Sequence, residues 1–427
     1  MTIIKLLLIA IPILITLTSC QTGEPAPIVG TPAVTRTQSA RGAEQASPET
    51  ALVYAEIENA PRAFPILYRT TATPHGMHEP AEGAYIGAWL SPETPMRIFE
   101  NQVSLHHAIY THEMQLSEEI PITWLLHCIA MQATPLIIIT PDETPHEDIH
   151  PTQMIIYQAQ RLGSFNLPMF IAFFPPEFIG NISPTEYTIM FRFARSVFSS
   201  HAPLASFVWT APYFDATPQN PFYPGHDAVD WVALSLLATR DHEGEKSDIF
   251  SQLEIFYHHF QSHKPIMLLP LGISHFSRGD YTYRTHETAA EIRQVYDTLR
   301  SFPRIGAVIY ADNLTLSPES WNDFSISAEP ILLAAYHEAI AHPHFLSILE
   351  TNAAAATRWT RSKNQGYYWE GRIYISAQTL SNELNIPLPR QSTEINNHHF
   401  AEARHLSGLN ITACQDQHVI FIDGHLD

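Results

Sequence analysis

The sequence predicts an α/β fold, a (β/α)8 TIM barrel followed by a small α+β C-terminal domain. Eight apolar runs of strand length follow one another between residues 84 and 313, with amphipathic helical patterns between them. Continuous apolar strands that alternate with helices indicate a parallel sheet, and eight such units over about 260 residues match a barrel of the usual ~250 residues. Beyond about residue 362, short strands and short helices predict a second, smaller domain.

The start of the chain is typical of an exported protein. Residues 1–19 hold one lysine and the apolar run LLLIAIPILITLT, which is too short for a confident transmembrane helix and predicts a signal peptide. Its end, Leu17-Thr18-Ser19-Cys20, resembles the bacterial lipoprotein cleavage box, which implies that Cys20 becomes the lipidated first residue of the mature chain. We therefore expect a lipoprotein on the outer face of a bacterial membrane or at the cell surface, with a plain secretory signal as the alternative.

Residues 20–80 are rich in Pro, Thr, Ala and Ser, and only Ala51–Ile57 and Phe64–Tyr68 are apolar. This composition predicts a tether that is partly ordered towards its end.

The predicted barrel spans residues 81–350. Its strand-like runs are AYIGAWL from Ala84, HHAIYTHEM from His106, PLIIITPD from Pro135, PMFIAFFPPE from Pro168, ASFVWTAPYF from Ala205, the run entered by Asp230-Trp231, PIMLLPLGIS from Pro265 and RIGAVIYADN from Arg304. Helical patterns between or after them begin at Pro151, Thr185, Thr288 and about Glu329. Sites in such barrels lie at the C-terminal ends of the strands, so the residues that close each run are the candidates.

The predicted C-terminal domain, residues 362–427, resembles the copper amine oxidase N-terminal-like domain of bacterial surface proteins. The resemblance is carried by the strand Gly371–Ile375, the following helix Ala377–Leu384 and a second copy from Phe400. It implies attachment to a cell wall or a ligand, and it implies no copper chemistry.

Composition excludes several classes of function. Against 23 Lys+Arg stand 43 Asp+Glu, a formal charge of -20, so nucleic acid would be repelled. The three cysteines, Cys20, Cys128 and Cys414, are too few for a disulfide framework. The 24 histidines are scattered without a repeating spacing, so we expect no metal, and no cofactor motif is present.

Across roughly residues 83–322 the barrel resembles glycoside hydrolase family 26, the β-mannanase family. The resemblance is carried by Phe207-Val208-Trp209, Tyr213, Tyr223–Asp227, Val229–Val232 and Lys264-Pro265. It implies retaining hydrolysis of a β-linked glycan of the mannan or glucan class, with an acid/base Glu ending the fourth barrel strand and a nucleophilic Glu ending the seventh. A retaining enzyme needs both carboxylates.

Only one of the two implied carboxylates is present. Glu177 ends the fourth run as the candidate acid/base, although Pro176 precedes it where the family has His, and Ala172 stands where the family has a strand Arg. The nucleophile position is Pro270, and the run Ile266–Ser274 contains no Asp or Glu. Because proline donates nothing to a central ladder, we expect the strand to end or bulge there.

Four aromatic residues near strand ends, Trp89, Trp209, Tyr213 and Tyr310, are candidates for stacking on sugars, with Asp312 as a further substrate-binding candidate. The alternative is that these rings belong to the core. We expect a barrel that has lost its nucleophile and binds glycan. An active hydrolase that pairs Glu177 with another strand-end carboxylate is the alternative; those carboxylates are Glu113, Asp142, Glu143, Asp215 and Asp312.

The segment His146-Glu147-Asp148-Ile149-His150 matches the H-E-x-x-H zinc-protease signature and leaves a zinc peptidase as a remote alternative. That signature needs a continuous helix, whereas Pro145 and Pro151 flank the segment. We expect a loop there, with Pro151 in the first turn of the next helix.

Overall fold

The computed structural model describes residues 60–71, 76–142, 150–176, 180, 182–211, 217–240, 248–317, 320–350, 357–389, 391–415 and 418–423. The predicted signal peptide, Cys20 and most of the predicted tether lie outside these residues. Among the described helices, none combines the length and the apolar character that crossing a bilayer requires.

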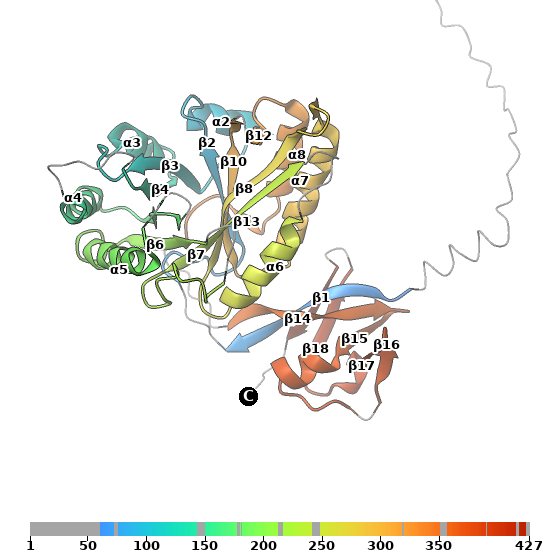
Figure 1. The fold of residues 1–427 in the computed structure, drawn as a ribbon. Coiled ribbons are helices and arrows are strands. Elements are labelled where there is room, and N and C mark those ends of the chain that lie inside the picture. Colours follow the sequence, from blue (N-terminus) through green and yellow to red (C-terminus); the bar gives the residue numbers. More distant parts are fainter. Residues whose placement is uncertain are drawn as a thin grey trace, which may run out of the picture. The chain divides into compact units, whose positions relative to one another are not determined.

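Parallel strands form a closed barrel, which confirms the predicted fold class (Figure 1). Each strand pairs with the next in chain order, and the last one, β10, pairs with both β2 and β8. The strands are β2 (Ala84–Leu90), β3 (Ile109–Gln115), β4 (Thr134–Thr140), β5 (Met169–Phe173), β6 (Ala205–Thr210), β7 (Trp231–Arg240), β8 (Ile266–Ser277) and β10 (Ile305–Asp312). They fall on the eight apolar runs of the sequence.

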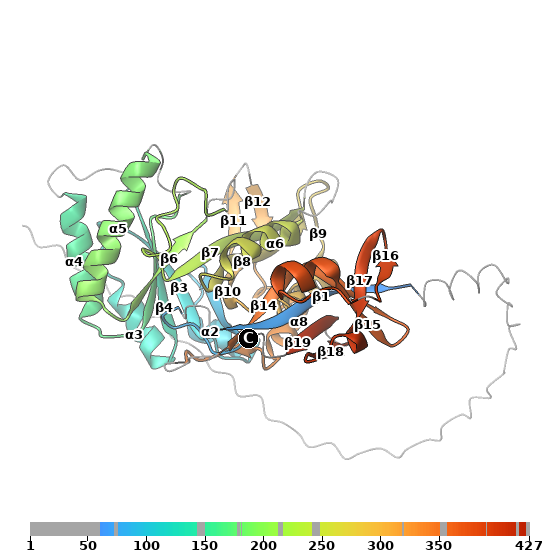
Figure 2. The same ribbon diagram turned by 90° about the horizontal axis from the view of Figure 1, so that it is seen from below.

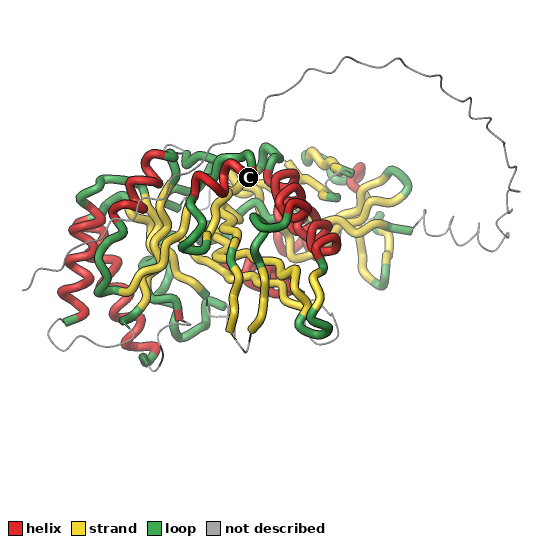
Figure 3. Tube along the Cα trace, turned by 90° about the horizontal axis from the view of Figure 1, so that it is seen from above, coloured by secondary structure: helices red, strands yellow, loops and turns green. Residues whose placement is uncertain are grey.

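Helices lie outside the strands of the barrel (Figures 2 and 3). They are α2 (Met96–Val103), α3 (Ile122–Ala130), α4 (Pro151–Gly163), α5 (Pro184–His201), α6 (Ile249–Phe260), α7 (Thr285–Leu299) and α8 (Pro330–Ile340). Side chains that accept from free backbone N–H groups fix the starts of two of them: Ser183 and Glu186 form a capping box on α5, and Asp248 caps α6.

Side-chain alternation along the strands separates two apolar cores. The barrel interior is filled by strand side chains such as Ile109, Ile138 and Trp231. The second core joins strand residues of the opposite parity, such as Tyr110, to residues of the surrounding helices. Successive residues of a strand therefore face the barrel interior and the helices in turn, and the inward-facing residues at the C-terminal ends of the strands face the barrel mouth.

Strand β8 is irregular at Pro270. Its pairing with both β7 and β10 shifts register between Leu268 and Leu271. Leu269 packs in the barrel interior, yet Leu271, which regular alternation would place on the same side, packs in the outer core. One extra residue has therefore been inserted into the ladder, which confirms the bulge expected at Pro270.

Short strands add hairpins near the ends of the barrel strands. β9 (Thr282–Tyr283) pairs antiparallel with the end of β8, and β11 (Leu314–Ser317) pairs with β12 (Ser320–Asp323) after β10. β13 (Phe345–Leu346) pairs with the start of β2.

A seven-stranded mixed sheet forms the second domain. In spatial order its strands are β16 (Thr393–Ile395), β17 (His398–Glu402), β15 (Arg372–Ser376), β14 (Thr357–Trp369), β1 (Arg62–Thr71), β19 (Val419–Asp423) and β18 (Asn410–Cys414). The helix expected over Ala377–Leu384 is a π-helix over Thr379–Glu383, and Ala403–His405 forms one 3-10 turn.

Strand β1 arises from the segment predicted as a tether. It lies between β14, with which it pairs antiparallel, and β19, with which it pairs parallel. The apolar patch Phe64–Tyr68 is thus part of an inner strand, and the barrel sequence is inserted between β1 and β14 of one sheet.

Candidate functional site

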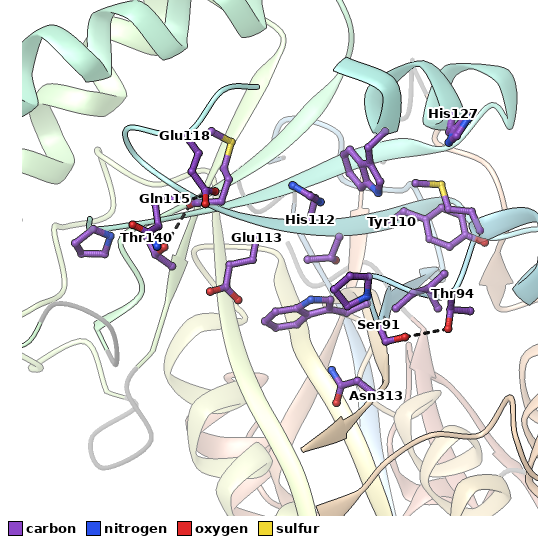
Figure 4. Close-up of a pocket in the computed structure, with 18 of the residues that line it drawn as sticks. Ser91, Thr94, Tyr110, His112, Glu113, Gln115, Glu118, His127, Thr140 and Asn313 are labelled. Carbon is purple, nitrogen blue, oxygen red and sulfur yellow. Dashed lines mark hydrogen bonds between the residues drawn. The ribbon is translucent and has the colours of Figure 1, made fainter. Parts of the chain in front are cut away.

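A cleft of about 1360 Å³ opens at the C-terminal ends of β2, β3 and β4, the face on which barrel enzymes place their sites (Figure 4). Tryptophans, carboxylates, histidines and small polar groups line it, together with Asn313 at the end of β10. The lining residues from these groups include Trp89, Trp124, Glu113, Glu118, Asp142, His112, His127, Ser91, Thr94, Thr111, Gln115 and Thr140. Its mixture of aromatic and hydrogen-bonding groups is typical of sites for small polar ligands.

Glu113 lies near the centre of this cleft, between Asn313 on one side and Glu118 on the other (Figure 4). Ile109 of the same strand packs in the barrel interior, so alternation turns Thr111 and Glu113 to the barrel mouth. Glu113 is an exposed residue at the cleft surface, yet partial desolvation of its carboxyl raises the pKa, and the nearby charge of Glu118 raises it further. A carboxyl that holds its proton at higher pH can donate a hydrogen bond or a proton to a ligand.

His112, the residue before Glu113, points to the other side of β3, towards the helices, and also lines the cleft. Its ring centroid lies 5.1 Å from that of Trp124 on α3, and both side chains are half-buried. Burial lowers the pKa of His112, which favours the neutral imidazole. The neutral ring offers one donor and one acceptor beside the indole.

The acidic loops around Glu113 are held by backbone N–H groups. Glu118 Oε2 accepts from the N–H of Gln115 at 2.8 Å, and Asp142 Oδ1 accepts from the N–H of Ser117 at 2.9 Å. Each carboxylate keeps its second oxygen as an acceptor while it lines the cleft. Two loops that follow adjacent strands are therefore tied together at the site.

Among the substrate-binding residues predicted from the sequence, Trp89 lies in the cleft. Trp209 and Tyr310 are fully buried and belong to the outer core, where their rings pack against Tyr223 and Tyr336. Both side chains point from their strands towards the helices, away from the barrel mouth. The expectation that these two rings stack on sugars is therefore wrong, because they pack in the core.

Asp312 is also buried, with 2 % of its surface exposed. Its Oδ1 accepts from the N–H groups of Ile326 at 2.6 Å and Ser327 at 3.0 Å. This carboxylate therefore fixes the chain that leads into α8 and has a structural role.

Several sequence candidates lie outside the described residues, namely Glu177, Tyr213, Glu143, Asp215, His146 and Glu147. His150 is described: it is the extended N-cap of α4, its Nδ1 accepts from the N–H of Thr152 at 3.3 Å, and Pro151 follows at the first helical position. The last histidine of the H-E-x-x-H string thus precedes a helix, as expected. Within the described part, no group of three His, Cys, Asp or Glu is placed to hold a metal ion.

Sequence reasoning missed His112, Glu118, Trp124 and Asn313 as parts of the site. His112 stands next to Glu113 at the end of a predicted strand, so that position carried a signal. Trp124 lies in ITWLLHCIA, where the apolar neighbours indicate core packing and hide the contribution of its ring to the cleft.

No protein-family model and no curated protein matches this sequence. Several solved structures resemble the chain at low identity. A family 26 β-mannanase from Bacteroides ovatus matches at 10% identity and TM-score 0.45, over 64% of this chain and 92% of that one. A family 39 glycoside hydrolase from Bacteroides cellulosilyticus matches at 10% identity and TM-score 0.44, over 76% and 79%. A family 128 endo-β-1,3-glucanase from Amycolatopsis mediterranei matches at 14% identity and TM-score 0.40, over 60% and 100%. The strand pairing of this chain, and not these low-identity matches, shows that it forms a barrel.

Proposed function

We propose that the barrel binds a β-linked glycan of the mannan or glucan class in the cleft and does not perform retaining hydrolysis. The cleft carries this proposal, because it places the Trp89 and Trp124 indoles beside carboxylates and a neutral imidazole at the mouth of the barrel. Indole rings stack on the apolar faces of sugars, and the polar groups pair with sugar hydroxyls.

The residues of β8 support the proposed loss of retaining hydrolysis. Its residues Ile266–Ser277 contain no Asp or Glu, and Pro270 at the bulge has no nucleophilic atom. A retaining glycosidase needs a second carboxylate about 5 to 5.5 Å from its acid/base, on the strand where the family resemblance implies it.

Binding to insoluble mannan and to mixed-linkage glucan tests the proposal, with Trp89→Ala as the test variant. Tyr157→Ala is the matched control, because Tyr157 is an exposed aromatic residue of α4 outside the cleft. We expect binding by the wild type and the control, and affinity weakened about tenfold in Trp89→Ala, the effect of losing one stacking contact. Equal affinity of all three proteins, or no binding by the wild type, would refute the proposal.

An active hydrolase is the second candidate, in which Glu113 would act as a second carboxylate in addition to Glu177. The orientation of Glu113 into the cleft favours this alternative. Release of reducing sugar from either glycan, lost in both Glu113→Gln and Glu177→Ala, would establish hydrolysis and exclude a purely binding role.

We further propose that the chain is exported and anchored through a lipid on Cys20, at the outer face of a bacterial membrane or at the cell surface. The lipoprotein box after the apolar run supports this. Labelled palmitate should be incorporated into the wild type and not into Cys20→Ala; equal labelling of both would exclude this anchor.

A further inference from the structure

Beyond the cleft, the end of β8 carries an exposed aromatic surface that the proposed site does not use. We propose that Tyr281 and Tyr283, here called the tyrosine platform, form a second sugar-stacking site for the part of a β-linked glycan that extends out of the cleft. This inference rests on the proposed function and assigns the platform to the same ligand class.

The platform is built by the β8–β9 hairpin. Phe276 pairs with Tyr283 across the two strands, and Ser277 pairs with Thr282. Tyr281 is 69% exposed and Tyr283 is 58% exposed, more than any other Phe, Tyr or Trp whose exposure the structure describes. The Phe276 ring supports both, with its centroid 6.3 Å from that of Tyr281 and 5.2 Å from that of Tyr283.

The turn that presents these rings is internally fixed. Asp280 Oδ1 accepts from the N–H of Thr282 at 3.3 Å and from its hydroxyl at 2.7 Å, and Arg284 donates to Oδ2 of the same carboxylate. The hydrogen bond from Thr282 is the main cause that lowers the pKa of Asp280 to about 2. Tyr281 adopts a φ of 55°, a left-handed conformation that needs such support. A platform fixed before binding loses less conformational entropy when a ligand stacks on it.

Contacts connect the platform to the cleft along the ends of β8 and β10. Asn313 lines the cleft, and its carbonyl accepts from the N–H of Phe324 at 3.1 Å. The preceding residue, Asp323, donates its N–H to Ser274 Oγ at 3.2 Å and lies 3.4 Å from His275 Nε2. The His275 ring lies 5.2 Å from that of Tyr283. Both surfaces therefore belong to the face where the parallel strands end.

The chemistry of the platform fits a neutral glycan. Two tyrosine rings, of roughly 150–250 Å² each, are far smaller than the ~800 Å² per partner of a stable protein interface, and match one or two sugar rings. The ion-paired Asp280, Arg284 and Glu287 beside them offer donors and acceptors to hydroxyl groups. The formal charge of -20 disfavours a polyanionic ligand.

The test compares a short β-linked oligosaccharide, which fills the cleft alone, with the corresponding soluble polysaccharide, using the full chain and isothermal calorimetry. For Tyr281→Ala/Tyr283→Ala we expect about tenfold weaker binding of the polysaccharide and unchanged binding of the oligosaccharide. Tyr281→Phe/Tyr283→Phe, which keeps the rings, should bind both as the wild type does. Tyr157→Ala is the control for loss of an exposed tyrosine.

Each result decides between the platform and the cleft. If the alanine double variant keeps the wild-type affinity for polysaccharide, the platform is refuted and the proposed function stands. If it loses both ligands equally while circular dichroism is unchanged, the separation of platform and cleft is refuted. A wild type that binds neither ligand refutes the proposed function and the platform with it. Concentration-dependent dimerisation that the alanine variant abolishes would assign the platform to a second copy of the chain and overturn the inference.

Discussion

Glu113 faces the barrel mouth because Ile109 and Thr111 precede it at intervals of two on the same strand, and Ile109 packs inside the barrel. The neighbouring His112 has the other parity and lies against Trp124 of α3. Two adjacent residues thus give the cleft an acid at the barrel mouth and an imidazole beside an indole.

The pKa of Glu113 predicts a pH dependence of stability. Because partial desolvation raises this pKa in the folded chain, the folded state binds more protons than the unfolded state, and stability falls as pH rises from the ordinary Glu value through the raised one. Glu113 is exposed, so solvent screening keeps this effect small. Glu113→Gln, which carries no charge, should therefore melt at a higher temperature than the wild type near pH 8 and at the same temperature near pH 3. Thermal unfolding at the two pH values measures this, and a difference that is larger at low pH would contradict the assigned cause.

At this scale the sequence predicts the types of residue in the site better than their orientations. Trp89, Glu113 and Asp142 are predicted strand-end residues and line the cleft. Trp209 and Tyr310 are equally plausible in the sequence, yet they face the helices. In strands buried on both sides every position is apolar, so no alternation of polar and apolar residues reveals which parity faces the mouth.

Strand β8 shows how one residue changes an element. The absence of an N–H on Pro270 predicts a disturbance of the ladder, and after the observed register shift Leu271 and Ile273 face the outer core instead of the barrel interior. The same strand continues to Ser277 and carries the β9 hairpin with the tyrosine platform. The sequence predicts the bulge, but the hairpin beyond it depends on the turn around Asp280, which no apolar periodicity marks.

Strand β2 lies close to both neighbouring strands at Gly87. A Cβ added there would lie 2.4 Å from Ile309 Cδ1 and 2.8 Å from the carbonyl oxygen of Ile109. The isoleucine side chain can turn aside, whereas the carbonyl belongs to the adjacent strand and is fixed by the barrel. Gly87→Ala should therefore lower the free energy of unfolding by about 1–3 kcal/mol, the usual cost of overpacking. Urea denaturation followed by circular dichroism measures it, and an unchanged midpoint would show that the barrel relaxes there.

On the scale of the whole chain, β1 precedes the barrel sequence and β14 follows it, and the two strands pair in one sheet. The sequence predicts two domains because composition and periodicity change near their boundary. It does not predict that Phe64–Tyr68 joins the distant domain, since pairing between strands far apart in the chain depends on tertiary packing and leaves no local pattern.

Arg361 of β14 joins that sheet to the barrel. Its Nη1 donates to the carbonyl oxygen of Ser301 at 3.1 Å, its Nη2 donates to Glu254 at 2.9 Å, and its Cζ lies 4.0 Å over the Phe302 ring. Gln261, at the end of α6, bonds both backbone groups of Arg361. Both terminal nitrogens and the flat face of this buried guanidinium thus contact barrel residues.

Arg361→Ala should lower the free energy of unfolding by about 3 kcal/mol, because buried hydrogen bonds to a charged group and a cation–π contact are lost together. Arg361→Lys keeps the charge but cannot form the fork, so a smaller loss is expected. Urea denaturation of the full chain tests both. If Arg361 couples the two domains, the alanine variant should also unfold in two transitions where the wild type unfolds in one. Equal midpoints for all three chains would show that the sheet is held to the barrel by other contacts.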